Sequence, residues 1–211
     1  MMVPDVNISI VNHSYLIVDL EGPAQVMDMT SRNSTSQAYT LTTIALMAAV
    51  TCVVGPLTIP VGPVPVSLVP LVILLSVYIL GTKKGTLSLL IYLLIGAVGV
   101  PVFSGFTGGI GKLAGPTGGY MIGYIFMALI AGWFIHRFYD KMALQFLGMV
   151  LGLAVLYAFG TAWLAYSAEM TFAAALAVGV LPFIVFDLIK IVIAIFLGRT
   201  VRKRLSRIGI Q

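Results

Sequence analysis

Long apolar segments, separated by short polar, glycine-rich or proline-rich breaks, cover most of the chain. Six of them predict helices that cross a membrane, because an apolar helix can pair all its backbone groups within one segment in lipid. The predicted spans are residues 39–54, 67–80, 86–100, 117–134, 142–166 and 182–200. We therefore expect an all-α integral membrane protein, a bundle of six transmembrane helices with a ligand pocket that faces outward.

Prolines and glycines divide this pattern further. Residues 171–198 would form one helix of roughly 42 Å, which exceeds a hydrocarbon core of about 30 Å. Because proline disrupts a helix interior, Pro182 should separate a short surface helix at about 171–179 from the last span. Prolines predict an extended loop over residues 56–70, and glycines predict a mobile loop over residues 101–115. Thr117 is a plausible cap for the helix that follows.

The first 38 residues differ from the rest of the chain. They hold four of the seven acidic residues and the polar run TSRNSTSQ. We expect residues 1–38 to be a poorly ordered cytoplasmic extension, residues 39–205 to be the membrane domain, and residues 206–211 to be a cytoplasmic tail.

Composition supports a membrane protein. The chain is 60% hydrophobic and 9% charged, with a mean hydropathy of +1.08, whereas a soluble domain carries about 25% charged residues. The net charge of +5 does not indicate nucleic-acid binding, because the basic residues flank the apolar spans. Cys52 is the single cysteine, so one chain forms no disulfide and no thiolate metal site. His136 stands in a short polar turn and is read as a solvated residue.

The basic residues also predict the orientation. With six spans, nine lysines and arginines fall on one side: Lys83, Lys84, Arg137, Lys141, Arg199, Arg202, Lys203, Arg204 and Arg207. The other side carries Lys112 alone among the loops. By the positive-inside rule the first side is the cytoplasm, which places both termini there and the glycine-rich loops outside.

Two sets of residues stand out within the spans. Asp187 and Lys190, three residues apart, share one helix face, and intramembrane charges usually mark a functional site. Such a pair either holds a polar ligand or is an internal structural ion pair. Ala45 and Ala49 have the small-xxx-small spacing that lets another helix approach closely, within the chain or from a partner.

No catalytic set is evident in the sequence. There is no Ser/His/Asp or Cys/His combination, no cluster of metal ligands and no Walker sequence, so we expect neither an enzyme nor a cofactor. Energy for transport would come from partners. A solitary secondary transporter, with Asp187 carrying a coupling proton, is the alternative, although we find no internal repeat of the kind such transporters show. An oligomeric channel is a further rival.

Four segments of the chain form a recognisable combination: PVPVSLVP (63–70), YLLIGAVGVPVFSGF (92–106), GKLAGPTGGYMIGY (111–124) and LPFIVFDLIK (181–190). Together they resemble the BioY family, the biotin-specific substrate-binding subunits (S-components) of energy-coupling factor (ECF) transporters. The resemblance covers about residues 39–205. It implies a bacterial cell-membrane subunit that binds extracellular biotin and works with a transmembrane coupling protein and two ABC-type ATPases. Ala45 and Ala49 match the family's docking motif for the coupling protein.

The resemblance also implies a ligand site. Biotin has an anionic carboxylate, a ureido group with two N–H donors and a carbonyl, and an apolar ring system. Asp187 can accept from a ureido N–H, and Lys190 can pair with the carboxylate or donate to the ureido carbonyl. Thr117 and Tyr120 at the start of one span are further candidates.

Other candidates come from the loops and walls. Tyr92 and Phe103 are expected wall or lid residues, with plain bundle packing as the rival interpretation. A polar residue that some relatives carry before GPTGGY is represented by Thr107 or Lys112. Val69 stands where family members commonly have glutamine, so another residue must supply any hydrogen bond made there.

Overall fold

The computed structural model describes residues 23–60 and 63–207, with side chains described from residue 37 onward except at Ser206. Two compact units make up the chain, residues 1–40 and residues 41–211. Helix α1 (Pro23–Val54) begins in the first unit, well before the predicted start at Tyr39, and its residues from Leu41 onward belong to the second. The predicted disorder and location of residues 1–38 stay predictions. Residues 1–22 and 208–211 lie outside the described residues.

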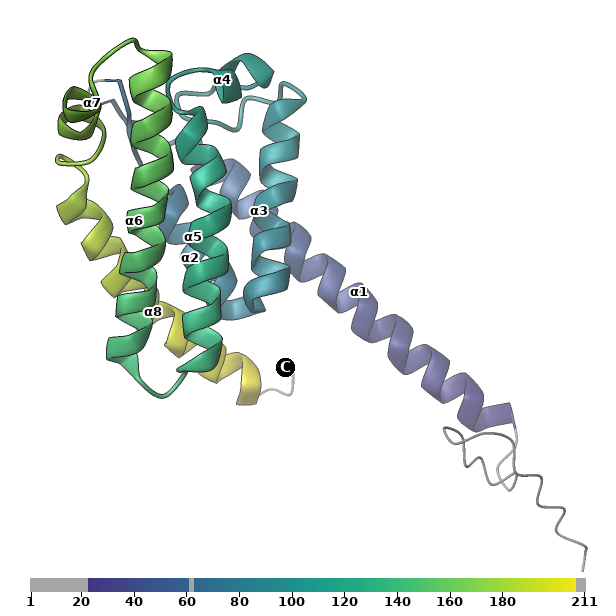
Figure 1. Cartoon of the computed structure of the whole chain (residues 1–211). Helices are drawn as coiled ribbons and strands as arrows, with labels where there is room; N and C mark the ends of the chain where they lie inside the picture. Colours follow the sequence, from purple (N-terminus) through teal and green to yellow (C-terminus); the bar gives the residue numbers. More distant parts are fainter. Residues whose placement is uncertain (1–22, 61–62, 208–211) are drawn as a thin grey trace, which may run out of the picture. The chain divides into compact units, whose positions relative to one another are not determined.

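Helices build the second unit (Figure 1). After α1 come the strands β1 (Thr58–Ile59) and β2 (Val66–Ser67), then α2 (Val69–Leu80), α3 (Thr82–Ala97), α4 (Ile110–Ala114), α5 (Gly118–Arg137), α6 (Met142–Ser167), α7 (Phe172–Gly179) and α8 (Ile184–Arg207). The two strands pair antiparallel within the predicted extended loop, with Thr58 opposite Ser67 and Ile59 opposite Val66. The mostly helical fold class is confirmed.

Each predicted span corresponds to one helix, and the short helix at 171–179 is α7. By length and apolarity, three of the described helices qualify as membrane spans: α1 over Gln37–Val54, α5 and α6. The α7–α8 pair, bent by 51° at the break that contains Pro182, counts as a fourth if taken as one span. The number of six crossings therefore stays a prediction.

Some helix boundaries differ from the predicted ones. α3 begins at Thr82 instead of Thr86, so Lys83 and Lys84 lie in its first turn and not in a separate turn. Gly81 alone makes the break, with a φ of 83° that glycine adopts without steric cost. The C-terminal end of α5 also differs. The helix extends beyond the predicted end at Phe134, includes His136, and ends at Arg137.

The apolar core lies between α2, α3, α5, α6 and α8. Its largest fully buried side chains include Tyr78, Ile73, Leu74, Met127, Met149 and Leu156. α5 and α6 run side by side (Figure 1), and glycines let them approach closely. A Cβ on Gly123 would lie 2.8 Å from Leu156 Cδ1. Many large apolar side chains are exposed on the helix surfaces, as expected for a bundle that faces lipid.

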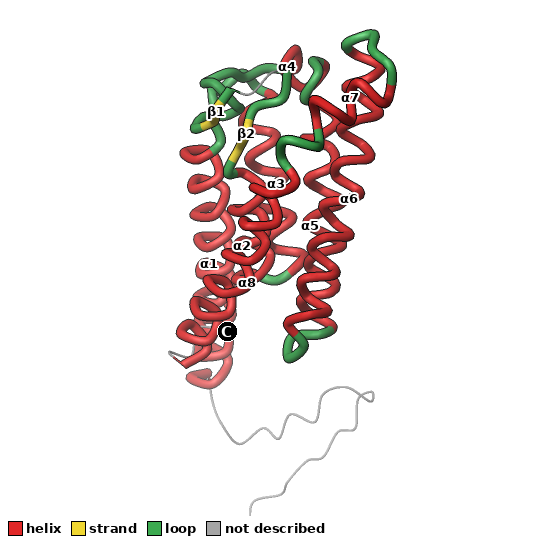
Figure 2. Tube along the Cα trace, turned by 90° about the vertical axis from the view of Figure 1, so that its left-hand side faces the viewer, coloured by secondary structure: helices red, strands yellow, loops and turns green. Residues whose placement is uncertain are grey.

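The two ends of the bundle differ in structure (Figures 1 and 2). The β1–β2 pair, α4 and α7 gather at one end. The α5–α6 turn and the C-terminal part of α8 lie at the other end. The first will be called the loop end and the second the basic end, because the second carries Arg137, Lys141 and the arginines of α8.

Candidate ligand-binding site

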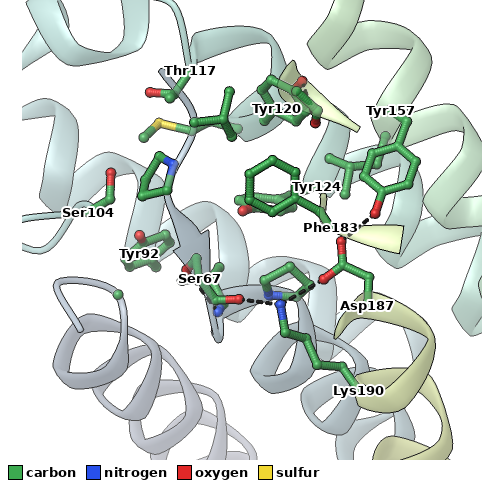
Figure 3. Close-up of a pocket in the computed structure, with 18 residues that line it drawn as sticks. Ser67, Tyr92, Ser104, Thr117, Tyr120, Tyr124, Tyr157, Phe183, Asp187 and Lys190 are labelled. Atoms are coloured by element: carbon green, nitrogen blue, oxygen red, sulfur yellow. Dashed lines mark hydrogen bonds and ion pairs between the residues drawn. The ribbon is translucent and has the colours of Figure 1, made fainter. Parts of the chain in front are cut away.

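A pocket lies within the loop end of the bundle, with about 630 Å³ of empty space, part of it open to solvent (Figure 3). The lining residues come from the segment between α1 and α2, from the loop between α3 and α4, from the residues just before α5 and α8, and from α2, α3, α5, α6, α7 and α8. They are Gly55, Val64, Pro65, Ser67, Val69, Pro70, Tyr92, Ser104, Thr117, Tyr120, Met121, Tyr124, Leu156, Tyr157, Gly179, Phe183, Asp187 and Lys190.

The Asp187–Lys190 pair forms one side of the pocket. Lys190 Nζ lies 2.7 Å from Asp187 Oδ1, and the two residues are only 7% and 6% exposed. The prediction that the two charges share a helix face is confirmed. Lys190 Nζ also donates to the backbone carbonyl of Ser67 at 2.6 Å. One of the three ammonium donors is left for a ligand.

Tyr157 holds the same carboxylate from α6. Its hydroxyl donates to Asp187 Oδ2 at 2.6 Å, so each carboxylate oxygen accepts one hydrogen bond from the protein (Figure 3). Each oxygen keeps a further lone-pair position, which a ligand N–H can use. Groups of the protein alone therefore orient the carboxylate, and it remains able to accept more hydrogen bonds.

Tyr120 lines the pocket and connects α5 to the end of α7. Its hydroxyl donates to the backbone carbonyl of Gly179 at 2.9 Å. Gly179 must lack a side chain here, because a Cβ would lie 2.2 Å from Tyr120 Oη. This contact fixes the position of the phenol ring in the wall.

Thr117 occupies the N-cap position of α5, as predicted, but its side chain makes no capping hydrogen bond. Its hydroxyl is buried and has no hydrogen-bond partner among the described residues, although the residue lines the pocket. A buried hydroxyl without a partner costs free energy, which a ligand that bonds to it would recover. Nearby, Trp163 Nε1 donates to the backbone carbonyl of Gly115 at 2.9 Å. This bond anchors the backbone segment that leads into α5.

The predicted wall residues Tyr92 and Phe103 have different positions. Tyr92 lines the pocket, whereas Phe103 is fully buried behind it and packs edge-on against its ring, with centroids 5.6 Å apart. Phe103 fits there because Gly96 has no side chain, since a Cβ would lie 2.1 Å from the phenyl ring. Phe103 supports the wall and does not belong to it.

The two loop candidates, Thr107 and Lys112, lie outside the pocket lining. Thr107 is exposed, and its hydroxyl donates to the carbonyl of Ser104 at 2.9 Å, while Lys112 lies in α4. Ser104 lines the pocket in their place. Val69 is also in the wall and only 2% exposed, so the position where glutamine was expected does face the ligand space. Ligand contacts by Thr107 and Lys112 stay predictions.

Comparison with known proteins now identifies the family. The sequence model described as the BioY family matches residues 27–207. The chain belongs to the BioY family. It is 35% identical to "Biotin transporter BioY2" of Lactococcus lactis subsp. cremoris (strain MG1363), over 81% of this chain and 94% of that protein. It is 39% identical to "Biotin transporter BioY" of Thermotoga maritima, over 70% of this chain and 86% of that one.

A solved structure has the same fold. It is the crystal structure at 2.1 Å of the S-component for biotin from an ECF-type ABC transporter, with a TM-score of 0.75 and 30% sequence identity, covering 80% of this chain and 93% of that chain. The resemblance predicted from the four segments is confirmed. This BioY family member is a multi-pass membrane protein. Its relatives are named transporters, in agreement with the prediction that it is not an enzyme.

Several lining residues of this BioY family pocket were missed by sequence reasoning. Ser67 contributes a backbone carbonyl, which no residue pattern reveals. Tyr124, Tyr157 and Phe183 are aromatic residues within apolar segments, where core packing is the ordinary expectation. A signal was available for Tyr124, which lies four residues after Tyr120 and therefore on the same helix face.

The proposed docking alanines lie on the outer side of α1. Ala45 and Ala49 are exposed, whereas Ile44 and Ala48 are buried. Within residues 41–211, the small-residue face is therefore not used for packing inside the bundle. It remains accessible to a partner helix in this BioY family member.

Proposed function

We propose that this chain binds biotin in the pocket of the loop end and serves as the S-component of an ECF-type ABC transporter. One observation carries the proposal: a buried Asp187–Lys190 pair, oriented by Tyr157, lines a pocket together with aromatic side chains. The shared fold with an S-component for biotin, at 30% identity, supports it.

The chemistry of biotin matches the polar groups of the pocket. Asp187 Oδ1 and Lys190 Nζ are 2.7 Å apart, so both can reach the same end of a ligand. The ureido group presents N–H donors and a carbonyl acceptor on neighbouring atoms, which this anion and cation complement. The ligand carboxylate then extends to the far side of the pocket, where Thr117 offers a free hydroxyl. Thr107 or Lys112 is the predicted polar residue of the loop before Thr117, and neither lines the pocket.

Apolar and aromatic residues complete the match. Tyr120, Tyr124 and Phe183 border the space between the charged pair and Thr117 (Figure 3). Aromatic faces suit the apolar bicyclic ring and alkyl tail of biotin, because they exclude water and strengthen the polar contacts. Biotin is in this proposal the transported ligand and not a cofactor.

Transport requires partners in this proposal. The sequence has no Walker motif, so ATP hydrolysis would come from two ABC-type ATPases, connected through a transmembrane coupling protein. The exposed Ala45 and Ala49 provide a surface on which a coupling helix can pack closely. The structural likeness to a subunit of an ABC transporter favours this arrangement over a solitary secondary transporter.

We place the chain in a bacterial cell membrane with both termini in the cytoplasm and the pocket open to the outside. The location of the basic residues supports this orientation. Arg137, Lys141 and the arginines of α8 lie at the end of the bundle opposite the pocket. Positive residues collect on the cytoplasmic side of membrane proteins, so the loop end should face outward.

The test is a biotin titration of the purified chain in detergent, followed by calorimetry and by tryptophan fluorescence. We expect saturation at nanomolar biotin, which corresponds to about −12 kcal/mol. Trp163 should report the binding, because its indole bonds to Gly115 beside Thr117. Trp163→Phe should abolish the fluorescence change but keep the heat, whereas Trp133→Phe, at the opposite end, should keep both. Absence of heat with the wild-type chain would reject the biotin assignment.

A further inference from the structure

A rigid platform lies at the basic end of the bundle, far from the pocket. Gln145 of α6 is fully buried, and its amide nitrogen donates to the carbonyl of Phe138 at 3.0 Å and to that of Tyr139. Its amide oxygen accepts from the hydroxyl of Tyr78 on α2. These bonds attach the turn between α5 and α6 to the core. The aromatic ring of Tyr139 is therefore presented in a defined position.

Two arginines of α8 stack on this ring. Gly198 lets α8 approach α2 closely, since a Cβ there would lie 2.6 Å from Tyr78 Cγ. The next residue, Arg199, has its Cζ 5.5 Å from the centre of the Tyr139 ring, and Arg202 has its Cζ 4.8 Å from it. Both distances are in the range of cation–π contacts. The two guanidinium groups thus converge on one aromatic ring.

Neither guanidinium has a hydrogen bond or an ion pair within the ranges that the structure describes. Arg199 Nη1 is buried without any hydrogen-bond partner, so part of this charge is desolvated and uncompensated. A guanidinium presents planar N–H pairs that fit a phosphate with two parallel hydrogen bonds. Two such groups around one ring form a site of positive charge with the geometry to bind an anion.

We infer that Arg199, Arg202 and Tyr139 bind the phosphate of an anionic phospholipid. The site lies at one end of a membrane-spanning bundle, where lipid phosphates are concentrated. Trp133 lies in the C-terminal part of α5, close in sequence to the α5–α6 turn. It is 57% exposed, as is typical of tryptophan at a membrane interface. A bound lipid would join α8 to the α5–α6 turn. The inference is independent of the proposed biotin binding, because the residues of the two sites do not overlap.

The test uses the full chain in a neutral detergent. Native mass spectrometry counts bound phosphatidylglycerol, and the apparent unfolding temperature is followed during titration with phosphatidylglycerol, phosphatidylcholine or glycerol phosphate. The variant is Arg199→Gln with Arg202→Gln. The matched control, Arg204→Gln with Arg207→Gln, removes the same charge from exposed positions of the same helix.

We expect the apparent affinity for phosphatidylglycerol to fall by about tenfold or more in the Arg199 and Arg202 variant, the effect of losing one or two charge-assisted hydrogen bonds. The control should stay within about twofold of wild type. If the double variant does not fold, Arg202→Gln alone should show a smaller loss in the same direction.

Four results would overturn the inference. Equal losses in the variant and the control would indicate diffuse charge attraction only. Equal stabilisation by phosphatidylcholine would remove the requirement for an anion, and an equal effect of glycerol phosphate would replace the lipid by a free phosphate. Unchanged lipid binding in the Arg199 and Arg202 variant, combined with lost uptake in cells, would assign the arginines to a protein partner.

Discussion

The Asp187–Lys190 pair allows a test that separates ligand binding from structure. Three variants are needed: Asp187→Asn, Lys190→Met, and the two combined. Asparagine keeps the shape of the carboxyl group and an acceptor for Tyr157, and methionine keeps most of the apolar stem of lysine. The single variants each leave one charge without its partner, whereas the double variant leaves none.

The burial of the pair sets the expected magnitudes. The side chains are 9% and 8% exposed and 2.7 Å apart, so little solvent screens them. Removing one partner of such a pair commonly costs 3–5 kcal/mol, because an uncompensated charge remains. We expect each single variant to lose about 3 kcal/mol of unfolding free energy and the double variant to lie within about 1 kcal/mol of wild type. Biotin affinity should fall by roughly 30-fold or more in all three, about 2 kcal/mol.

Unfolding in mixed micelles gives the stabilities, and calorimetry gives the affinities. The double variant is the informative one, because its unfolding free energy should return to near the wild-type value while its contacts to the ligand stay lost. If the double variant binds biotin as tightly as wild type, the pair is a structural ion pair and the ligand is held elsewhere. If the single variants are as stable as wild type, the pair is better hydrated than its burial indicates.

Three further changes test other parts of the reasoning. Thr117→Val should keep or raise the stability of the free protein, because the buried hydroxyl has no described partner, and should weaken biotin binding about three- to tenfold in calorimetry; unchanged affinity would remove Thr117 from the site. Gly179→Ala should weaken binding by displacing the Tyr120 ring, with a Cβ 2.2 Å from its hydroxyl; an unaltered titration would show that the wall adapts. Ala49→Leu should spare binding by the purified chain but impair uptake in cells by blocking close helix approach, whereas Ala154→Leu, on an exposed position of α6, should do neither; normal uptake by Ala49→Leu would contradict docking.

Apolarity placed the helices correctly because lipid and core both select apolar side chains along whole segments. Helix ends were less well predicted, since they depend on single residues. Gly81 alone separates α2 from α3, and the expected turn through Lys83 and Lys84 is helical. The break at Pro182 was predicted because the physical constraint is local and strong, and α8 begins at Ile184.

The site was predicted where charge made the residues unusual. Asp187 and Lys190 stand out in an apolar span, and both line the pocket. Tyr157 was missed because a tyrosine in an apolar helix is ordinary and its partner lies 30 positions away. Phe103 was predicted in the wall, but it lies behind the wall because its ring occupies the space that a side chain on residue 96 would fill. Sequence spacing does not reveal such a packing relation.

The bond from Lys190 to the Ser67 carbonyl has a consequence for how long a captured ligand stays. Hydrogen bonds within the protein hold Asp187 and Lys190 in place, so ligand binding needs little ordering of these side chains and more of the contact energy appears as affinity. A nanomolar complex that forms at about 10⁶ M⁻¹ s⁻¹ persists for about 10³ s. Faster release therefore requires a conformational change that breaks the contacts between the site and the ligand. Strand β2 is the part to move, because displacing Ser67 removes a bond from the ammonium group that the ligand would contact.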